Sequence, residues 1–271
     1  MGKKSRSKTK IKKSKAEKEE EKFLKLLGTM SVDDVDSGSG ENTEYAEGSS
    51  LDIFNVASRE PGFMEAALGD GWGSKGCANT VFCVEEREKE NEGDAAAKQG
   101  EYSMCYVCDC GSFSLQEKHK LYRMFLENMK ELYERSSGGF DEEDKIKEFF
   151  ERDSRYFVVR DGAGSGEIVG YMQFRYCYDV DTEDEEGRSE CLYIFELQIS
   201  RAHQSKGIGG ALVNALKGLA KQSNLKMSLT AFKHNPGARR FYGRHGFVVD
   251  EKISPAEDDE EDYLILSKFI D

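Results

Sequence analysis

The sequence predicts an α/β (α+β) domain over residues 101–271, in which helices flank a central, mixed and twisted sheet. Three observations lead to this prediction. Residues 115–135 place apolar side chains along one face of a helix, three apolar strand-like segments follow, and the last third of the chain alternates between helical and strand-like segments. Strand–helix–strand units combined with hairpins are typical of a mixed sheet covered by helices.

The long helix at 115–135 should begin after Ser114, because serine is a preferred N-cap residue, and it should end at Gly138-Gly139. Before it we expect a short helix at 16–27 and a strand at 102–108. The elements expected after it are, in order, a charged helix at 141–152, strands at 155–160, 167–176 and 191–199, a helix at 207–222, a strand at 225–232, a helix at 236–245, and strands at 246–250 and near 262–269.

Charge is distributed unevenly along the chain. The formal net charge is −13, yet residues 3–15 hold eight basic side chains and no acidic one, so the rest of the chain carries −21. There is no run of about 18 apolar residues that could span a bilayer, and no apolar segment follows the basic start as in a signal peptide. The basic run is expected to be a solvated tail, a nuclear-import signal or a nucleic-acid contact.

The composition divides the chain into three parts. Residues 1–27 form the basic tail and the short helix, and residues 101–271 form the folded domain. Between them, residues 28–100 contain stretches rich in Gly, Ser, Asp and Glu, which cannot bury enough apolar surface to fold alone. We therefore expect 28–100 to be a linker and an insertion, partly disordered.

The cysteines indicate structural thiols. Seven cysteines are an odd number in a chain without a secretory signal, which favours free thiols in a reducing compartment. Cys105-Tyr-Val-Cys108-Asp-Cys110 could ligate a metal, but no second Cys or His pair follows at a zinc-like spacing. We expect these cysteines to be small buried side chains, and no metal site.

A glycine-rich loop, Gln204-Ser-Lys-Gly207-Ile-Gly209-Gly210, joins a predicted strand to a predicted helix. Glycines let the backbone approach a ligand closely, and the unpaired N–H groups at a helix start suit a pyrophosphate. The loop is not a Walker A motif, and Leu212 stands where a dinucleotide fingerprint needs its third glycine. The alternative is a plain turn at the start of a helix.

A second motif follows the glycine-rich loop, Asn235-Pro-Gly-Ala238-Arg-Arg-Phe241-Tyr242-Gly-Arg-His-Gly246-Phe247. In this order and spacing, the two motifs resemble those of the GCN5-related N-acetyltransferase (GNAT) superfamily. The resemblance implies the GNAT fold and acetyl-CoA as co-substrate, with its pyrophosphate on the first motif and its pantetheine arm beside the second. The cofactor-binding residues that it implies are Leu197, Gln198, Ile199, Gln204, Ser205, Lys206, Gly207, Ile208, Gly209, Gly210, Asn235 and Ala238.

Further segments resemble the N-alpha-acetyltransferase D (NatD) family within this superfamily. They are the lysine-rich start, Tyr193-x-x-Glu196-x-Gln198, Leu229-Thr-Ala-Phe-Lys-His-Asn235, Ile253-Ser-Pro255 and Tyr263-x-Ile-Leu-Ser267. That family acetylates the N-terminal amine of histones H-four and H-two-A, whose tails begin Ser-Gly-Arg-Gly. The resemblance implies histone tails as partners and a monomer in the nucleus and cytoplasm, with possible nucleosome contact by the basic start.

Acetyl transfer to an α-amine needs only mild base catalysis, because an α-amine has a pKa of about 8 and is partly neutral near pH 7. Glu196 is the candidate base, since it interrupts an apolar strand that leads into the glycine-rich loop. The alternative is an edge-strand glutamate that faces solvent. Tyr242 and Tyr263 are candidate proton donors to the leaving thiolate, and either could instead be a packing aromatic.

The acceptor peptide would need carboxylates for its basic side chains. Acidic runs occur at 179–186 and 258–262, and Asp179 and Asp181 match best the arginine-binding acids of the family. Phe140 stands where the family has a segment with tryptophan, which is a departure from its pattern. The substrate-binding residues that we expect are Tyr133, Phe140, Asp179, Asp181, Tyr193, Phe195, Thr230 and Tyr263.

Two other functions remain open from the sequence. One is a GNAT acetyltransferase that acts on a lysine or a small-molecule amine. The other is a non-enzymatic chromatin-binding module with a basic tail.

Overall fold

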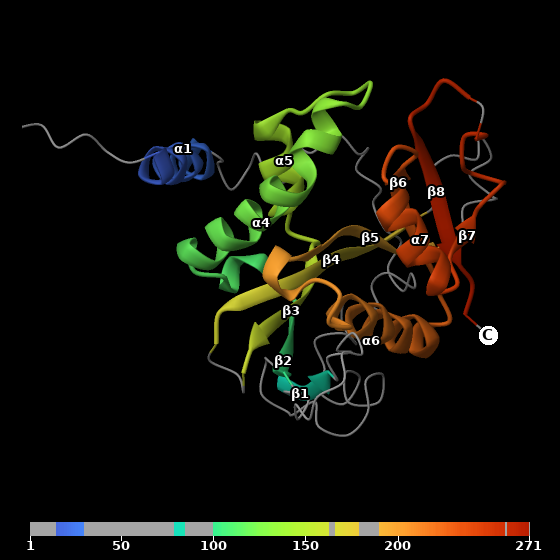
Figure 1. The fold of residues 1–271 in the computed structure, drawn as a ribbon, viewed down its shortest axis with the longest axis horizontal. Helices are drawn as coiled ribbons and strands as arrows, with labels where there is room; N and C mark the ends of the chain where they lie inside the picture. The colour runs from blue at the N-terminus through green and yellow to red at the C-terminus, as the bar shows by residue number, and fades with distance from the viewer. Residues whose placement is uncertain are drawn as a thin grey trace, which may run out of the picture.

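The computed structural model describes residues 15–29, 79–84, 100–162, 166–178, 190–257 and 259–270 (Figure 1). Most of the basic run and of the predicted linker lies outside these residues. The acidic segment 179–186, with Asp179 and Asp181, also lies outside them.

The described strands form one eight-stranded sheet in the order β1-β2-β3-β4-β5-β6-β8-β7. Neighbouring strands are antiparallel except β5 and β6, which are parallel. The mixed sheet predicted from the sequence is therefore confirmed. The strands are β1 (Asn79–Val84), β2 (Gly100–Val107), β3 (Arg155–Asp161), β4 (Ile168–Tyr178), β5 (Glu190–Ile199), β6 (Lys226–Phe232), β7 (Val248–Val249) and β8 (Tyr263–Lys268).

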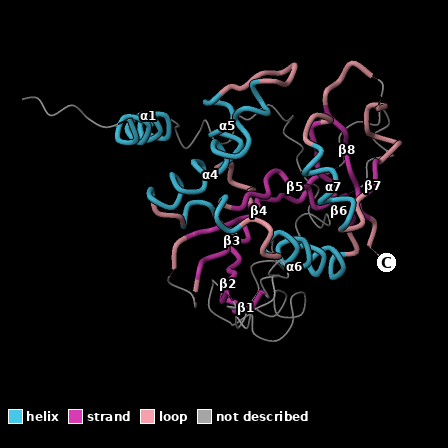
Figure 2. The backbone as a smooth tube through the Cα atoms, in the orientation of Figure 1, coloured by secondary structure: helices cyan, strands magenta, loops and turns pink. Residues whose placement is uncertain are grey.

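Helices cover both faces of this sheet (Figure 2). They are α1 (Lys15–Thr29), α4 (Leu115–Glu134), α5 (Glu142–Phe149), α6 (Ile208–Ser223) and α7 (Pro236–Arg244). Side chains of α1, α4 and α5 pack together on one face, and those of α6 and α7 pack on the other.

The alternation of side chains along β3 shows why the sheet has two cores. Tyr156 and Val158 pack with α4 and α5, while Phe157 and Val159 pack with the α6 side. Because successive strand residues point to opposite faces, a strand buried on both sides is a continuous apolar run rather than an alternating one. Within the predicted strand 155–160, residues 156–159 form such a run.

The first helix, α1, packs on the domain mainly through Phe23, with Leu26 and Leu27 beside it. Phe23 is buried and stacks against Tyr122 of α4 at 5.3 Å between ring centroids, with Phe150 and His119 also in contact.

Strand β1 was not predicted from the sequence, since 79–84 lies within the stretch expected to be linker and insertion. It pairs along its whole length with β2.

The start of α4 follows the N-cap prediction for Ser114. The Ser114 side chain accepts a hydrogen bond from Glu117 N at 3.3 Å, and Glu117 Oε2 accepts one from Ser114 N at 2.9 Å, so both halves of a capping box are present. Ser114→Ala is expected to lower the free energy of unfolding by about 1 kcal/mol, measured by urea denaturation.

The matched control for this cap prediction is Gln116→Ala, at an exposed position in the first turn of the same helix. It should change the free energy of unfolding by less than about 0.5 kcal/mol. Equal effects of the two substitutions would contradict a capping role for Ser114.

Candidate active site

A cavity of about 1280 Å³ opens where β5 and β6 part. The two strands pair only between 191–194 and 226–229, and β6 continues beyond this point with β8 alone. The register of β5 against β4 also shifts at Phe195, which has no partner in that ladder. Such a bulge bends a strand, so the last residues of β5 turn away from β6 and line the cavity instead.

The N-terminus of α6 forms one end of the cavity. Gly207 is the N-cap, with a φ of 83°, and no side chain caps the helix. The first helical backbone bond runs from Ala211 N to Gly207 O at 3.0 Å, so the N–H groups of the three preceding residues are left for a ligand. Unpaired N–H groups and the positive end of the helix dipole favour an anion here.

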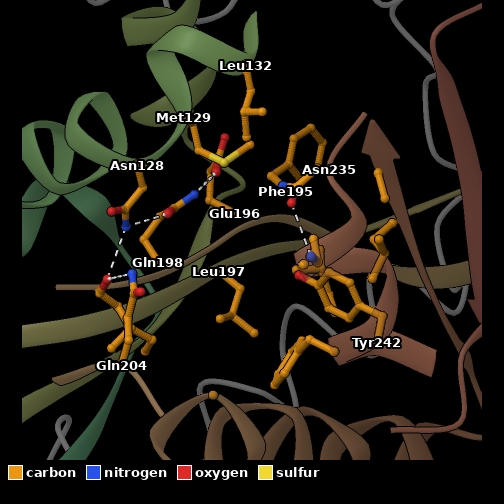
Figure 3. Close-up of a pocket in the computed structure, with 18 of the residues that line it drawn as sticks. Asn128, Met129, Leu132, Phe195, Glu196, Leu197, Gln198, Gln204, Asn235 and Tyr242 are labelled. Atoms are coloured by element: carbon orange, nitrogen blue, oxygen red, sulfur yellow. Dashed lines mark hydrogen bonds between the residues drawn. The ribbon is translucent and has the colours of Figure 1, made fainter. Parts of the chain in front are cut away.

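Close packing requires two glycines at the start of α6. A Cβ atom on Gly209 would lie 3.0 Å from Phe241 Cζ, and one on Gly210 would lie 3.1 Å from His245 Cε1. The short segment before α6 is tied to β5, because Gln204 donates a hydrogen bond to Ile199 O at 3.1 Å (Figure 3). The two glycines let α6 pack closely against α7, and ligand binding by the loop stays a prediction beside the alternative of a plain turn.

Every residue predicted to bind the cofactor lines this cavity. One of them also has a structural role, because Asn235 Oδ1 caps α7 by accepting a hydrogen bond from Ala238 N at 3.1 Å. Their contacts with a cofactor stay predictions.

Glu196 is buried in the wall of the cavity, with 3% of its side chain exposed. Its Oε1 lies 2.8 Å from Lys145 Nζ, and its Oε2 accepts a hydrogen bond from Gln198 at 2.7 Å. Burial raises the pKa of Glu196 above its ordinary value, and the ammonium of Lys145 opposes that rise. The alternative of a solvent-facing glutamate on an edge strand is wrong, because β5 lies inside the sheet.

A chain of polar side chains supports Glu196 from α4 and α5. Asn128 donates to Gln198 Oε1 at 3.0 Å, and the Lys145 ammonium donates to the hydroxyl of Tyr133 at 3.0 Å and pairs with Glu148 (Figure 3 shows Asn128, Gln198 and Glu196). Buried polar groups stabilise a fold only when they are satisfied in this way.

Lys145, Asn128 and Glu148 also line the cavity and were not predicted from the sequence. A signal for Lys145 was present, because it lies four residues before Phe149 and so on the apolar face of its helix. A charge on such a face indicates a buried partner. Other cavity-lining residues that were not predicted are Met129, Leu132, Ile194, Arg201, His203, Leu229, Ala231, Phe232, Gly237, Phe241, Arg244 and His245.

The two candidate proton donors lie in different places. Tyr242 is buried in the cavity wall, and burial together with the charge of Glu196 raises its pKa, so the hydroxyl stays protonated at neutral pH. Tyr263 begins β8, pairs with Phe232 in the ladder and is not among the residues that line the cavity. Of the two tyrosines predicted to donate a proton, Tyr242 lines the described cavity and Tyr263 does not.

Four of the predicted substrate residues line the other end of the cavity: Tyr133, Tyr193, Phe195 and Thr230. The hydroxyls of Tyr193 and Thr230 are hydrogen-bonded to each other, and the guanidinium of Arg175 lies 4.1 Å from the ring centroid of Phe195. Their contacts with a substrate stay predictions.

Phe140 does not lie in the cavity wall, contrary to its prediction. Its ring centroid is 6.1 Å from those of both Phe125 and Tyr133, so it supports Tyr133 from the side of α4 and α5. Phe140 lies there because its apolar ring is buried against the other rings of the core between the two helices.

Basic side chains gather around the α6 end of the cavity. Arg201, Lys206 and Arg244 line it together with His203 and His245. Burial and the charges of Lys268 and Arg244 lower the pKa of His245. Positive charge beside a helix N-terminus favours phosphate groups.

The thiols of Cys105, Cys108, Cys110, Cys177 and Cys191 are free, and Cys110 donates to Phe150 O at 3.2 Å. Cys177 and Cys191 face each other across β4 and β5 with 3.7 Å between their sulfurs. Among the described residues, no group of three His, Cys, Asp or Glu side chains could hold a metal ion. No helix within the described ranges is long and apolar enough to cross a membrane.

The cavity combines a helix N-terminus that is open to an anion, two strands that part and a buried carboxylate between them. This arrangement suits the transfer of a group from a donor that carries phosphates. The model of the acetyltransferase (GNAT) family matches residues 119–247. The match spans just under half of the chain, and the mixed α/β architecture described above matches the GNAT fold.

Several solved structures are similar to this chain. NAA60 of Arabidopsis thaliana in complex with acetyl-CoA is 16% identical, with 62% of this chain and 98% of that chain covered and a TM-score of 0.45. Ard1 from Thermoplasma volcanium is 16% identical, with 58% and 94% covered and a TM-score of 0.39. An acetyltransferase of the GNAT family from Staphylococcus aureus is 14% identical, with 62% and 99% covered and a TM-score of 0.44.

Proposed function

We propose that this protein transfers the acetyl group of acetyl-CoA to the N-terminal amine of histones H-four and H-two-A, whose tails begin Ser-Gly-Arg-Gly. The observation that carries the proposal is the position of Glu196. Its carboxylate is buried in the cavity wall where β5 and β6 part, between an anion-binding end and an aromatic end.

The anion-binding end fits acetyl-CoA. The unpaired N–H groups at the start of α6 would bind the pyrophosphate, and Lys206 and Arg244 would add positive charge. Residues Leu197–Ile199 of β5 have no partner on β6, so their backbone groups can hydrogen-bond the amides of the pantetheine arm.

Glu196 would act as the base. It accepts the proton that the amine loses as its nitrogen bonds to the thioester carbon, either directly or through a water. Backbone N–H groups after Glu196 would stabilise the oxyanion. When the carbon–sulfur bond breaks, the hydroxyl of Tyr242 would donate a proton to the leaving sulfur.

Three contacts across the aromatic end support a chain terminus as the acceptor. His234 Nε2 donates to Leu132 O at 3.1 Å, Ser137 N donates to Asp262 Oδ2 at 2.6 Å, and the rings of Tyr133 and Phe232 meet edge to face with centroids 5.0 Å apart. They join the end of α4 to the ends of β6 and β8. A cavity bridged in this way favours the end of a chain over a lysine side chain within one.

The acceptor carries positive charge, and Glu148 lines the cavity with 37% of its side chain exposed. An ionised carboxylate that is partly desolvated can pair with an arginine, and each such bond to a charged group contributes about 1.5–3 kcal/mol. We propose the same role for Asp179 and Asp181, which lie outside the described residues.

The proposal extends to location and partners. A histone acetyltransferase would work in the nucleus and cytoplasm as a monomer, and the basic run 3–15 would serve import or nucleosome contact. A variant that lacks residues 3–15 should acetylate a short peptide at an unchanged rate. In cells it should no longer accumulate in the nucleus, which the fluorescence of a tagged protein would measure.

The direct test incubates the full chain with acetyl-CoA and a Ser-Gly-Arg-Gly-Lys peptide, beside the same peptide with a blocked N-terminus. We expect acetylation of the free α-amine only, located by mass spectrometry. Replacing the peptide arginine by alanine should lower kcat/KM about 10-fold or more, since a lost charged hydrogen bond costs about 1.5–3 kcal/mol.

Two outcomes would contradict the proposal. Acetylation of the blocked peptide at an equal rate would indicate a lysine acetyltransferase. Turnover of neither peptide would favour an acetyltransferase of small amines or a binding module, which a release assay for free CoA with an amine panel would separate.

A further inference from the structure

We infer that Lys145 is a positioning residue for this reaction: its ammonium keeps the carboxylate of Glu196 ionised and aimed at the cavity, and so sets the pH range in which the enzyme works. The inference rests on the proposed function. It is carried by a contact between α5 and β5, two elements far apart in the sequence.

The geometry holds the Lys145 ammonium in one place. Its Nζ lies 2.8 Å from Glu196 Oε1 and 3.0 Å from the hydroxyl of Tyr133, and it also pairs with Glu148. The rings of Phe125 and Tyr133 lie 5.0 and 5.1 Å away, within the range of a cation–π contact. Only 7% of the Lys145 side chain is exposed.

The carboxylate of Glu196 is fixed at both oxygens as a result. Oε1 contacts Lys145, and Oε2 accepts from Gln198, which is itself held by Asn128 of α4. A carboxylate held on both sides cannot rotate freely, and a base held in orientation is more effective than one that must be ordered in each turnover.

The titratable side chains around Glu196 come from four other elements. Lys145 and Glu148 face it from α5, Tyr133 from α4, Tyr171 from β4 and Tyr242 from α7. The tyrosines are neutral, because burial raises the pKa of each of them. Glu148 repels the charge of Glu196, and burial disfavours it, so Lys145 supplies the stabilising positive charge.

Lys145 itself stays charged. Burial would lower its pKa, but the charges of Glu196 and Glu148 raise it well above the ordinary lysine value. The ammonium therefore does not exchange its proton at neutral pH. It acts on Glu196 through its charge and the ion pair that they form, rather than by touching the substrate.

Removal of the Lys145 ammonium should lower the activity at neutral pH. Without the ammonium, the pKa of Glu196 rises further, a larger fraction of the carboxyl is protonated at neutral pH, and that fraction cannot accept a proton. Lys145→Met keeps the length of the side chain and removes the charge. We expect kcat/KM for the peptide at pH 7 to fall at least 30-fold and the acidic limb of its pH profile to move up by at least one unit.

Two further variants separate charge from packing. Lys145→Arg keeps the positive charge and should return the acidic limb to within about half a unit of its original position. Lys147→Met makes the same change on the same helix, at a lysine that pairs with Glu143 at 3.3 Å on the surface. It should leave the rate and the pH profile unchanged, and an equal loss from Lys147→Met would overturn the inference.

Lys145→Met leaves a buried carboxylate without its partner, which can destabilise the fold. The double variant Lys145→Met with Glu196→Gln removes both charges, so no unpaired buried carboxylate remains to destabilise the fold. In the Glu196→Gln background, Lys145→Met should change kcat less than 3-fold, because Lys145 acts only through Glu196. A 30-fold loss in both backgrounds would show a structural role alone.

A measurement without substrate distinguishes this inference from the proposed function. In protein with ¹³C-labelled glutamate side chains, the carboxyl signal that disappears in Glu196→Gln should titrate at higher pH in Lys145→Met than in the original protein. If the peptide is not acetylated but this shift occurs, the proposed function fails, while the effect of Lys145 on the ionisation of Glu196 stands. An unmoved titration would overturn the inference.

Discussion

Glu196→Gln is expected to lower kcat for the Ser-Gly-Arg-Gly-Lys peptide about 100- to 1000-fold, because an amide cannot accept the amine proton and positioned bases contribute factors of this size. The loss should be largest near pH 7 and smaller above pH 8, where an α-amine with a pKa of about 8 is already neutral. The measurement is steady-state kinetics across pH, with release of free CoA followed against time.

The fold should survive this change, since Lys145 keeps Glu148 as a partner after Glu196 becomes neutral. The matched control is Glu190→Gln, at the start of the same strand and outside the described cavity lining. It should change kcat less than 3-fold. Full activity of Glu196→Gln at every pH would remove Glu196 as the base, and a large loss in both variants would indicate damage to β5 instead.

Gly209→Asp is expected to weaken acetyl-CoA binding at least about 100-fold, which corresponds to about 2.7 kcal/mol. The new carboxylate would lie at the N-terminus of α6, where the pyrophosphate would bind, and would repel it. Its Cβ would also lie 3.0 Å from Phe241 Cζ. The helix should still form, because an acidic residue in the first turn favours the helix dipole. Titration calorimetry with acetyl-CoA measures the loss.

Gly209→Asn has nearly the same volume without the charge and is the matched control. We expect a loss of about 10-fold or less from crowding against Phe241. The difference between Asp and Asn should shrink as salt is raised, since screening weakens repulsion between charges. If the two variants bind acetyl-CoA equally, the phosphates do not lie at the start of α6.

Local patterns were predictable because they depend on neighbours in the chain. Ser114 and Glu117 are three residues apart, so their capping box could be expected from the sequence. The glycine-rich loop was found in the same way, since helix starts and glycines act locally. Strand β1 was missed, because a six-residue strand with only four apolar residues, within a polar stretch, gains stability only by pairing with β2.

The candidate site was predictable where its parts follow one another along the chain. Glu196, Gln198 and the α6 loop lie within 15 residues, and all of them line the cavity. Lys145, Glu148 and Asn128 were missed, because they reach the cavity from helices more than 45 residues away along the chain. Tyr263 was placed in the site by resemblance, but its position in β8 puts it outside the described lining.

The sequence by itself determined the order and type of most elements and the glycine-rich start of α6, because periodicity, caps and glycine act over a few residues. Only the tertiary structure decided that β5 and β6 part at Phe195 and that Glu196 is buried beside Lys145. The physical reason is that burial and charge pairing depend on which distant elements pack together, and no local pattern encodes that.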